Sequence, residues 1–291
     1  MNPAPWAVVL AGGDGTRVSD LTRGVDGTPT PKQYCRFGGT TPMVRWALDR
    51  ARRVVSPKRV VVVVNESHRR FWEPALADVP RQNVLIQPSN RGTGAGVLLA
   101  LLALEGRTDP DTPILLLPSD HYVARETVMA YAMAAALFAA RCGTRDVVLL
   151  GLNPSAADHD YGWILPAADG QVAAVGQFVE KPPAGALPGL VHRGALINSF
   201  VMAGRIRALV GMFERSLPAL VAAFRNRMRP PLGVSGLAGL YASIPATDMS
   251  RQVLQPDPGR LSVVRVPQCG WSDLGTPVRL QSYLSTVAVA A

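Results

Sequence analysis

The 291-residue sequence has few cysteines, few aromatic side chains and no long apolar run. Its three cysteines, Cys35, Cys142 and Cys269, lie far apart, which argues against a disulfide framework or a zinc knuckle and indicates core or bystander thiols. No apolar run approaches the roughly 20 residues needed to span a bilayer, and no charged segment precedes the first apolar run. We therefore expect a cytoplasmic protein with no membrane partner.

Lysine is also scarce, with three lysines against 27 arginines and a net charge of +9. Such a charge is found in nucleic-acid-binding proteins, but the arginines are scattered, aromatic residues make up only 6%, and no RNA- or DNA-binding motif is visible. We expect no nucleic-acid partner. Where arginine is used so freely, a lysine that stands in a motif, as Lys32 and Lys181 do, indicates that a compact ammonium group is needed there.

Strand-like and helix-like segments alternate through the first half. Apolar or β-branched runs predict strands, and segments with helical spacing or alanine- and leucine-rich composition predict helices. The predicted strands are 6–11, 59–65, 83–87, 114–117 and 146–152, and the predicted helices include 42–55, 67–77 and 126–141. A further alanine- and leucine-rich helix is opened by the segment QPSNRGT (87–93) and continues to about residue 104. This alternation predicts an α/β fold with a mostly parallel central sheet between two layers of helices.

The second half does not continue the regular alternation of predicted strands and helices. It predicts strands ending near residues 181 and 202 and at 261–266, helices over 205–229, and a final helix from residue 277. Stretches rich in proline and glycine at 182–189 and 230–239 predict surface loops. We expect a single domain over 1–291, built from halves 1–152 and 153–291 that share one sheet.

A glycine-rich segment follows the first predicted strand. In AGGDGTR, Gly12, Gly13 and Gly15 would let the backbone approach a polyphosphate, and Arg17 adds positive charge. The dinucleotide fingerprint needs a glycine where Val18 stands, and the Walker pattern needs a lysine directly after its last glycine, so neither fits. A plain glycine turn between strand and helix is the alternative interpretation.

Two carboxylates stand in short polar motifs after apolar strands. Asp120 follows the strand at 114–117, and Asp273 follows the strand at 261–266. One or two carboxylates together with phosphate oxygens are the usual ligands of Mg²⁺, so these two acids are the predicted metal ligands. Asp120 could instead cap the helix that follows it.

Eight motifs occur in the order seen in bacterial mannose-1-phosphate guanylyltransferases: GGDGTR, PKQ, QPSNRGT, PSDH, YGWI, FVEKP, INSF and WSDLGT, spanning positions 12–276. The chain thus resembles the sugar-phosphate nucleotidyltransferases. The resemblance implies a Rossmann-like nucleotidyltransferase fold, Mg²⁺ dependence and synthesis of an NDP-sugar. GTP and mannose 1-phosphate are the implied substrates, and GDP-mannose and pyrophosphate the implied products. A homodimer is common in the family, and the cupin or β-helix domain of its long members is not expected here.

The resemblance also implies that residues 1–152 form a nucleotide-binding half and that residues 153–291 form a lobe that binds the sugar phosphate. It implies roles for individual residues as well. The triphosphate would be held by Gly12, Gly13, Gly15, Thr16 and Arg17, with Lys32 on the phosphates at the reacting centre. The base and ribose would contact Gln87, Arg91, Gly92 and Thr93. The sugar phosphate would be bound by Gly162, Glu180, Lys181 and Asn198, and the metal by Asp120 and Asp273. We expect His121 to be structural, Trp271 to belong to the core and Asp14 to be a loop residue.

Two motifs depart from the family pattern. Phe200 stands where the family has glycine in Trp-Asn-Ser-Gly, and Asp158-His159-Asp160 replaces the usual Glu-Thr-Gly. These changes indicate a differently shaped sugar pocket, so another sugar 1-phosphate or another NTP is the alternative within the same reaction. A non-catalytic nucleotide-sugar-binding regulator is the alternative from another class. It would be expected to lack the acids or the basic residues of the phosphate loop.

Overall fold

The protein's structure is a computed structural model that describes residues 3–23, 27–143, 145–228 and 234–290. Within those residues, one sheet has the strand order β3-β2-β1-β4-β9-β6-β10-β8-β7. Four strands of the first half pair in parallel: β1 (Trp6–Ala11), β2 (Val60–Asn65), β3 (Val84–Gln87) and β4 (Pro113–Pro118). Because parallel strands end at the same edge of a sheet, the polar segments that follow them converge there.

The second half joins the same sheet through β9 (Leu196–Arg205), which lies between β4 and β6 (Val147–Leu152) and is antiparallel to both. Beyond β6, the strand β10 (Leu261–Val266) is parallel to it. An antiparallel pair completes the sheet, with β8 (Val172–Glu180) on β10 and β7 (Gly162–Pro166) on both β8 and β9. The two predicted halves thus share one sheet.

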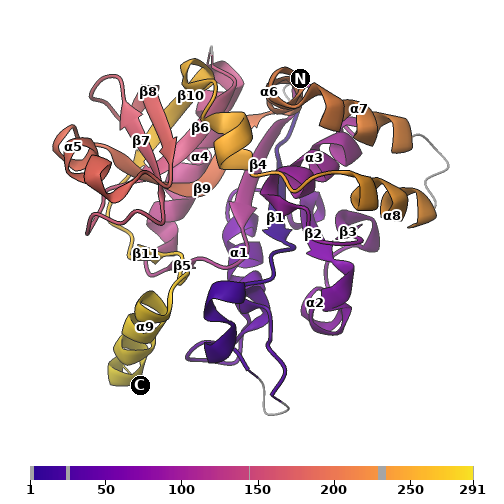
Figure 1. Cartoon of the computed structure of the whole chain (residues 1–291), viewed down its shortest axis with the longest axis horizontal. Helices are drawn as coiled ribbons and strands as arrows, with labels where there is room; N and C mark the ends of the chain where they lie inside the picture. Colours follow the sequence, from indigo (N-terminus) through magenta and orange to yellow (C-terminus); the bar gives the residue numbers. More distant parts are fainter. Residues whose placement is uncertain (1–2, 24–26, 144, 229–233, 291) are drawn as a thin grey trace.

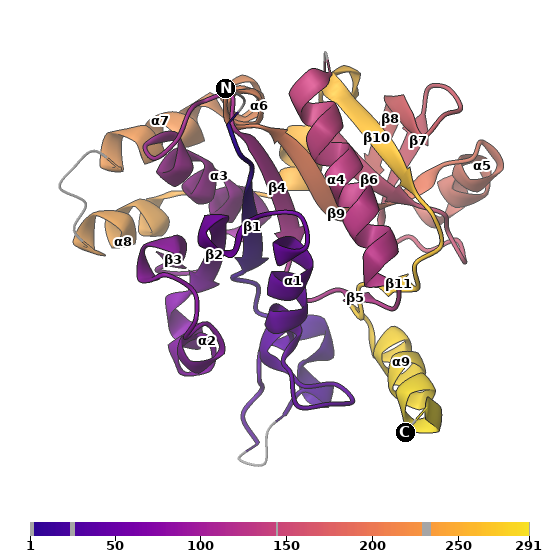
Figure 2. The same cartoon turned by 180° about the vertical axis from the view of Figure 1, so that it is seen from behind.

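Helices cover both faces of the sheet. One face carries α1 (Met43–Arg52), α2 (Arg69–Ala75) and α4 (Glu126–Cys142), of which α1 and α4 stand in front in Figure 2. The other carries α3 (Gly92–Glu105), α6 (Ile206–Ser216), α7 (Pro218–Arg227) and α8 (Val234–Ser243), labelled in Figure 1. Successive valines of β2 alternate between the two cores and all are buried, which explains its unbroken β-branched run. The three-layer α/β prediction is confirmed.

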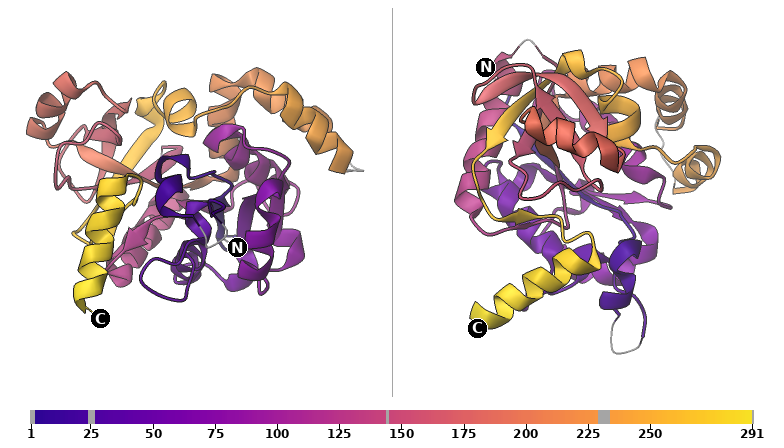
Figure 3. Two further views of the ribbon diagram at one scale, coloured as in Figure 1. Left: turned by 60° about the horizontal axis from the view of Figure 1, so that its bottom comes forward. Right: turned by 60° about the vertical axis from the view of Figure 1, so that its left-hand side comes forward.

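A second, two-stranded sheet brings distant segments together. β5 (Tyr122–Val123) pairs antiparallel with β11 (Trp271–Ser272), so that Ser272 lies opposite Tyr122. The helix α9 (Pro277–Ala290) follows and stands away from the main sheet (Figures 1 and 3). Its Leu280 is buried in a small cluster near the start of α1, and its Tyr283 packs against that cluster. The short sheet therefore carries the residues before β5 and after β11 to one place.

The predicted surface loops are partly wrong. Residues 229–233 lie outside the described part of the chain, but α8 already begins at Val234 and buries Leu240 and Tyr241, whose ring packs against Phe224. The tertiary contact outweighs the glycine content of this segment. In the stretch 182–189, α5 (Leu187–His192) begins with a proline in its first turn, where proline is tolerated. Over the described residues, no helix is both long and apolar enough to cross a membrane.

Candidate functional site

A cavity of about 380 Å³ opens at the edge where the parallel strands end. The predicted site residues line it, with the exception of Thr16, Lys32 and Arg91. Its walls include the glycine segment after β1, the acids Asp120 and Asp273, and the second-half residues Gly162, Glu180, Lys181 and Asn198. One cavity therefore collects residues from both halves of the chain.

The glycine segment is held in place by the PKQ motif. The side-chain amide of Gln33 donates hydrogen bonds to the carbonyls of Ala11 (3.0 Å) and Gly13 (2.8 Å), and the hydroxyl of Tyr34 donates to Ala11 (3.1 Å). Gln33 and Tyr34 are buried. Sequence reasoning missed these supporting roles, although Gln33 stands directly beside the predicted Lys32.

Lys32 lies behind the cavity wall, where its side chain is only 4% exposed. Its Nζ is 2.8 Å from a carboxylate oxygen of Asp120 and donates to the backbone carbonyl of Asp273. An ammonium group so deeply buried is costly without partners of this kind. The ammonium group of Lys32 thus contacts both predicted metal ligands, Asp120 through its carboxylate and Asp273 through its backbone carbonyl.

The two acids flank the short sheet, with Asp120 two residues before β5 and Asp273 directly after β11. Burial favours the neutral acid at Asp120 and is the largest single influence, but the charges of Lys32 and His121 and the hydrogen bonds to the carboxylate together outweigh it and hold the pKa of Asp120 below its ordinary value. Asp273 accepts hydrogen bonds from the hydroxyl of Tyr161 (3.1 Å) and from Arg279. Asp120 is therefore ionised near neutral pH, and the Asp273 side chain is a hydrogen-bond acceptor.

His121, next to Asp120, is a buried neutral group. Burial lowers the pKa of His121 to about 4, and the Trp271 indole N–H lies 3.3 Å from its Nδ1 as a donor. A neutral imidazole that accepts this hydrogen bond fits the structural role predicted for His121. Trp271 packs on the core as predicted, although it also lines the cavity.

Among the residues predicted to bind the nucleotide, those at the start of α3 are fixed by close backbone contact. Gly92 has φ +79°, and a Cβ there would lie 2.3 Å from the carbonyl oxygen of Thr247, so only glycine fits. The hydroxyl of Tyr241 donates to the side-chain oxygen of Gln87 at 3.2 Å, which orients that amide at the cavity wall. Arg91 does not line the cavity, because its Nε donates to the Tyr241 carbonyl at 2.6 Å.

Among the residues predicted to bind the sugar phosphate, Glu180 is half-buried beside Gly162. Burial, reinforced by the nearby Asp248, raises the pKa of Glu180 to about 7. A Cβ on Gly162 would lie 2.5 Å from a carboxylate oxygen of Glu180, so the glycine makes room for this side chain. Asp248 and Ser250 also line the cavity, and the sequence carried no motif that pointed to them.

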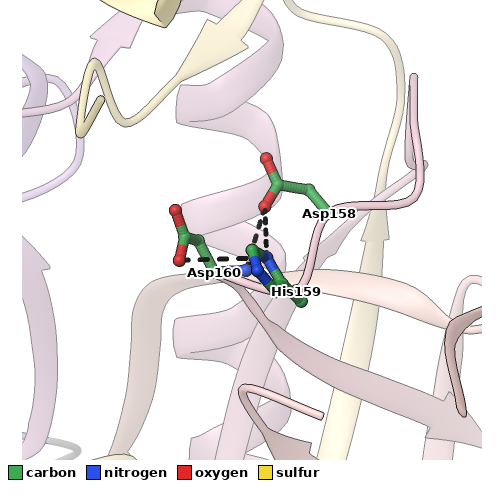
Figure 4. Close-up of side chains that lie close together, drawn as sticks. All are labelled: Asp158, His159 and Asp160. Atoms are coloured by element: carbon green, nitrogen blue, oxygen red, sulfur yellow. Dashed lines mark hydrogen bonds and ion pairs between the residues drawn. The ribbon is translucent and has the colours of Figure 1, made fainter. Parts of the chain in front are cut away.

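Figure 4 shows Asp158, His159 and Asp160, whose ligand atoms lie within 4.8 Å of one another. Arg279 donates to Asp158 and lies 3.8 Å from Asp160. A guanidinium group already balances these acids, so we interpret them as an ion-pair network. Sequence reasoning noticed the acidic departure at 158–160 but not its partner, which lies more than 100 residues away on α9.

The donor chemistry of the site fits Mg²⁺. Carboxylate oxygens are its preferred protein ligands, and Asp120 and Asp273 both line the cavity that the glycine segment enters. Lys32 and Arg279 hold these acids in the structure, as an ammonium and a guanidinium group can do for carboxylates that also bind a cation.

An α/β sheet with a glycine segment, basic residues and paired acids in one cavity defines a nucleotide-binding enzyme fold. The profile of one family matches residues 6–287, and the chain belongs to that family, the nucleotidyl transferases.

The curated relatives include polysaccharide biosynthesis proteins and mannose-1-phosphate guanylyltransferases. Xanthan biosynthesis protein XanB from Xanthomonas campestris is 29% identical over 278 residues, covering 92% of this chain and 57% of the relative. Mannose-1-phosphate guanylyltransferase ManC from Salmonella typhimurium is 28% identical over 285 residues, covering 93% of this chain and 58% of the relative. This chain thus spans less than two thirds of the length of these relatives.

Solved structures show the same fold. A protein from Thermus thermophilus described as a mannose-1-phosphate geranyltransferase superposes with a TM-score of 0.80 at 30% identity, covering 94% of this chain and 77% of the other. A UDP-glucose pyrophosphorylase superposes with a TM-score of 0.63 at 14% identity, covering 99% of this chain and 100% of the other. The predicted nucleotidyltransferase fold is confirmed.

Proposed function

We propose that the protein transfers a nucleotidyl group from a nucleoside triphosphate to a sugar 1-phosphate and releases pyrophosphate. GTP and mannose 1-phosphate are the proposed substrates, and GDP-mannose is the proposed product. The observation that carries the proposal is the single cavity that combines the glycine segment and Arg17 with Asp120, Asp273 and the pair Glu180 and Lys181. Such a cavity suits two anionic reactants that must meet.

In the proposed reaction, an oxygen of the sugar phosphate attacks the α-phosphorus of the triphosphate in line with the leaving group. The new P–O bond forms as the bond to pyrophosphate breaks. The attacking phosphate is already ionised, so no general base is required, which agrees with a neutral His121. Arg17 and Lys181 line the cavity and supply positive charge to the reactants.

The chain's own residues would arrange the centre. Lys32 fixes the carboxylate of Asp120 and the backbone of Asp273 with one ammonium group. These two acids would hold Mg²⁺, which when bound neutralises phosphate charge. Glu180 and Asn198 would accept or donate hydrogen bonds to sugar hydroxyls at the opposite end of the cavity.

The choice of GTP and mannose 1-phosphate rests on relatives. The curated relatives include mannose-1-phosphate guanylyltransferases from Salmonella typhimurium and Escherichia coli at 28% and 31% identity. A non-catalytic regulator is less favoured, because the acids and the basic residues that it would be expected to lack are present. The homodimer and the cytoplasmic location stay predictions.

The test is pyrophosphate release with Mg²⁺, crossing GTP, ATP, CTP, UTP and dTTP against 1-phosphates of mannose, glucose, fucose and a heptose. GTP with mannose 1-phosphate is expected to give the highest kcat/KM. A different best pair would keep the reaction and change the substrates. Tight binding of GTP without turnover of any pair would favour the regulator.

A further inference from the structure

Phe200 has a backbone conformation that bulky residues rarely adopt. Its φ is +60°, in the left-handed region that glycine enters freely and phenylalanine enters only with strain. Strain of this kind is retained where the surrounding structure enforces it, and it concentrates at functional sites. Phe200 lies in the middle of β9, a strand whose other interior residues are buried.

A bulge in β9 creates this conformation. The pairing of β6 with β9 shifts between Leu149, which lies opposite Met202, and Gly151, which lies opposite Asn198. Between these two pairs, Leu150 on β6 therefore lies across from three residues of β9, Ser199 to Val201, and Phe200 is one of the excess residues. Bulges of this kind re-aim a side chain and are frequent beside active sites.

Polar side chains hold the bulge in place. The backbone N–H of Phe200 donates to the side-chain oxygen of Asn198 at 3.1 Å. The Ser199 hydroxyl donates to the carbonyl of Leu150 at 2.7 Å and accepts from the backbone N–H of Val201 at 3.1 Å. Side chains thus bind the backbone N–H groups of Phe200 and Val201 and the carbonyl of Leu150 at the bulge, and the strained position is built into the strand.

The result is an aromatic ring in the cavity wall. Phe200 lines the cavity together with Asn198, Glu180 and Lys181, and it also packs against the hydrophobic core beneath the sheet. These three neighbours are the predicted sugar-phosphate contacts. Polar groups fix hydroxyls in such pockets, while an aromatic face covers the apolar C–H face of a sugar ring.

We propose that Phe200 is a specificity-determining residue whose ring forms the apolar wall of the sugar subsite. The inference rests on the proposed function and deepens it. The ring contacts the sugar of the substrate and fills space that a bulky ring substituent, such as an acetamido group, would need. The pocket therefore takes sugar 1-phosphates with small substituents and rejects N-acetylhexosamine 1-phosphates.

The experiment compares GDP and GDP-mannose binding by calorimetry in the wild type, Phe200→Gly and Phe200→Asn. Glycine and asparagine both tolerate a positive φ, so both variants can keep the backbone conformation of position 200. If one of them folds poorly, the other can still be measured. Phe138→Ala is the matched control, because Phe138 is an aromatic residue on α4 that is 69% exposed and does not line the cavity.

We expect both Phe200 variants to lose roughly tenfold in GDP-mannose affinity while GDP affinity stays within about twofold. The kcat/KM ratio of N-acetylglucosamine 1-phosphate to mannose 1-phosphate should rise roughly tenfold in Phe200→Gly. Equal losses for GDP and GDP-mannose, no loss for either, or an unchanged ratio would overturn the inference. A wild-type protein that binds neither GDP nor GDP-mannose would instead overturn the proposed function itself.

Discussion

Arg279 binds both carboxylate oxygens of Asp273 through one nitrogen, with Nη1 lying 2.8 Å from Oδ1 and 3.0 Å from Oδ2. Its guanidinium also stacks over the ring of Tyr161, 4.2 Å from the centroid, and its Nη2 donates to Asp158. The predicted metal ligand Asp273 is therefore tied to the acidic segment 158–160 by a residue from α9. The contribution of the Arg279 charge to the stability of this network can be tested by replacing Arg279.

The variant Arg279→Gln should lower the free energy of unfolding by about 1–3 kcal/mol, because it leaves partly buried carboxylates without their counter-charge. Added Mg²⁺ should stabilise this variant more than the wild type, since the Asp273 carboxylate loses the guanidinium group that competes with a cation for it. Thermal unfolding with and without Mg²⁺ measures both effects. Arg69→Gln is the control, because its pair with Glu66 is exposed. Equal stabilisation of variant and wild type by Mg²⁺ would contradict this account of Arg279.

The variants Asp120→Asn and Asp273→Asn should each reduce Mg²⁺-dependent turnover at least about 100-fold while the fold is kept. The reason is that the amide retains the size of the side chain and removes the charge that binds the cation. Pyrophosphate release and far-UV circular dichroism are the measurements. Asp20→Asn, at an 87% exposed side chain, should behave as the wild type. Near-normal turnover in either test variant would exclude that acid as a metal ligand.

The stability of the protein should fall as the pH rises through the titration of Glu180. Its folded pKa of about 7 lies above the ordinary value of 4.5, so the folded state holds the proton more tightly than the unfolded state. The loss begins near pH 4.5, is complete above pH 7 and amounts to about 3 kcal/mol. Urea unfolding of the wild type and Glu180→Gln at pH 5 and pH 8 measures it.

Glu180→Gln should remove this pH-dependent loss. Glu66→Gln is the control, because a hydrogen bond from Arg69 lowers the pKa of Glu66 below its ordinary value of 4.5. Glu66 therefore stays ionised between pH 5 and pH 8, and this variant should show the same change as the wild type. If the wild type and Glu180→Gln show the same change between the two pH values, Glu180 does not titrate in this range.

The variant Gly162→Ala should raise the KM for the sugar 1-phosphate roughly tenfold and leave the KM for GTP unchanged. The added methyl group would meet the end of the Glu180 side chain, which can move away at little cost in stability but then leaves its place in the cavity. Steady-state kinetics measure both constants. Gly189→Ala is the control, since a Cβ there meets nothing within 4 Å. A parallel rise in both KM values would point to a general disturbance of the fold.

Much of the fold could be predicted from local patterns. The unbroken run of valines in β2 predicts a strand buried on both faces, and the predicted strand 261–266 coincides with β10. The place of β9 could not be predicted, because its pairing with β4 and β6 depends on contacts between distant segments. α8 was missed because its burial against α7 outweighs a composition typical of loops.

The site was predictable where motifs follow strands. Asp120, Gln87 and Gly12 stand at strand ends, and parallel strands place such residues at one edge. Arg279 was not predictable, because nothing in its helix indicates a partner at Asp158. The strain at Phe200 was also hidden, since a residue's φ depends on a bulge that only the paired strands define. Sequence alone showed that position 200 was unusual, but not what the ring does.

The insertion of β9 between β4 and β6 sets the order in which a nascent chain can fold. β4 ends at residue 118 and β6 at residue 152, but their shared partner strand β9 is complete only when residue 205 has been synthesised. Until then, both strands expose an unpaired edge, which invites aggregation or capture by chaperones. The partner strand of β5 is synthesised later still, because β11 comprises residues 271–272. On the ribosome, the segment that brings Asp273 to Asp120 is thus made about 150 residues after Asp120, and a chain interrupted between β10 and β11 retains the main sheet without the paired acids.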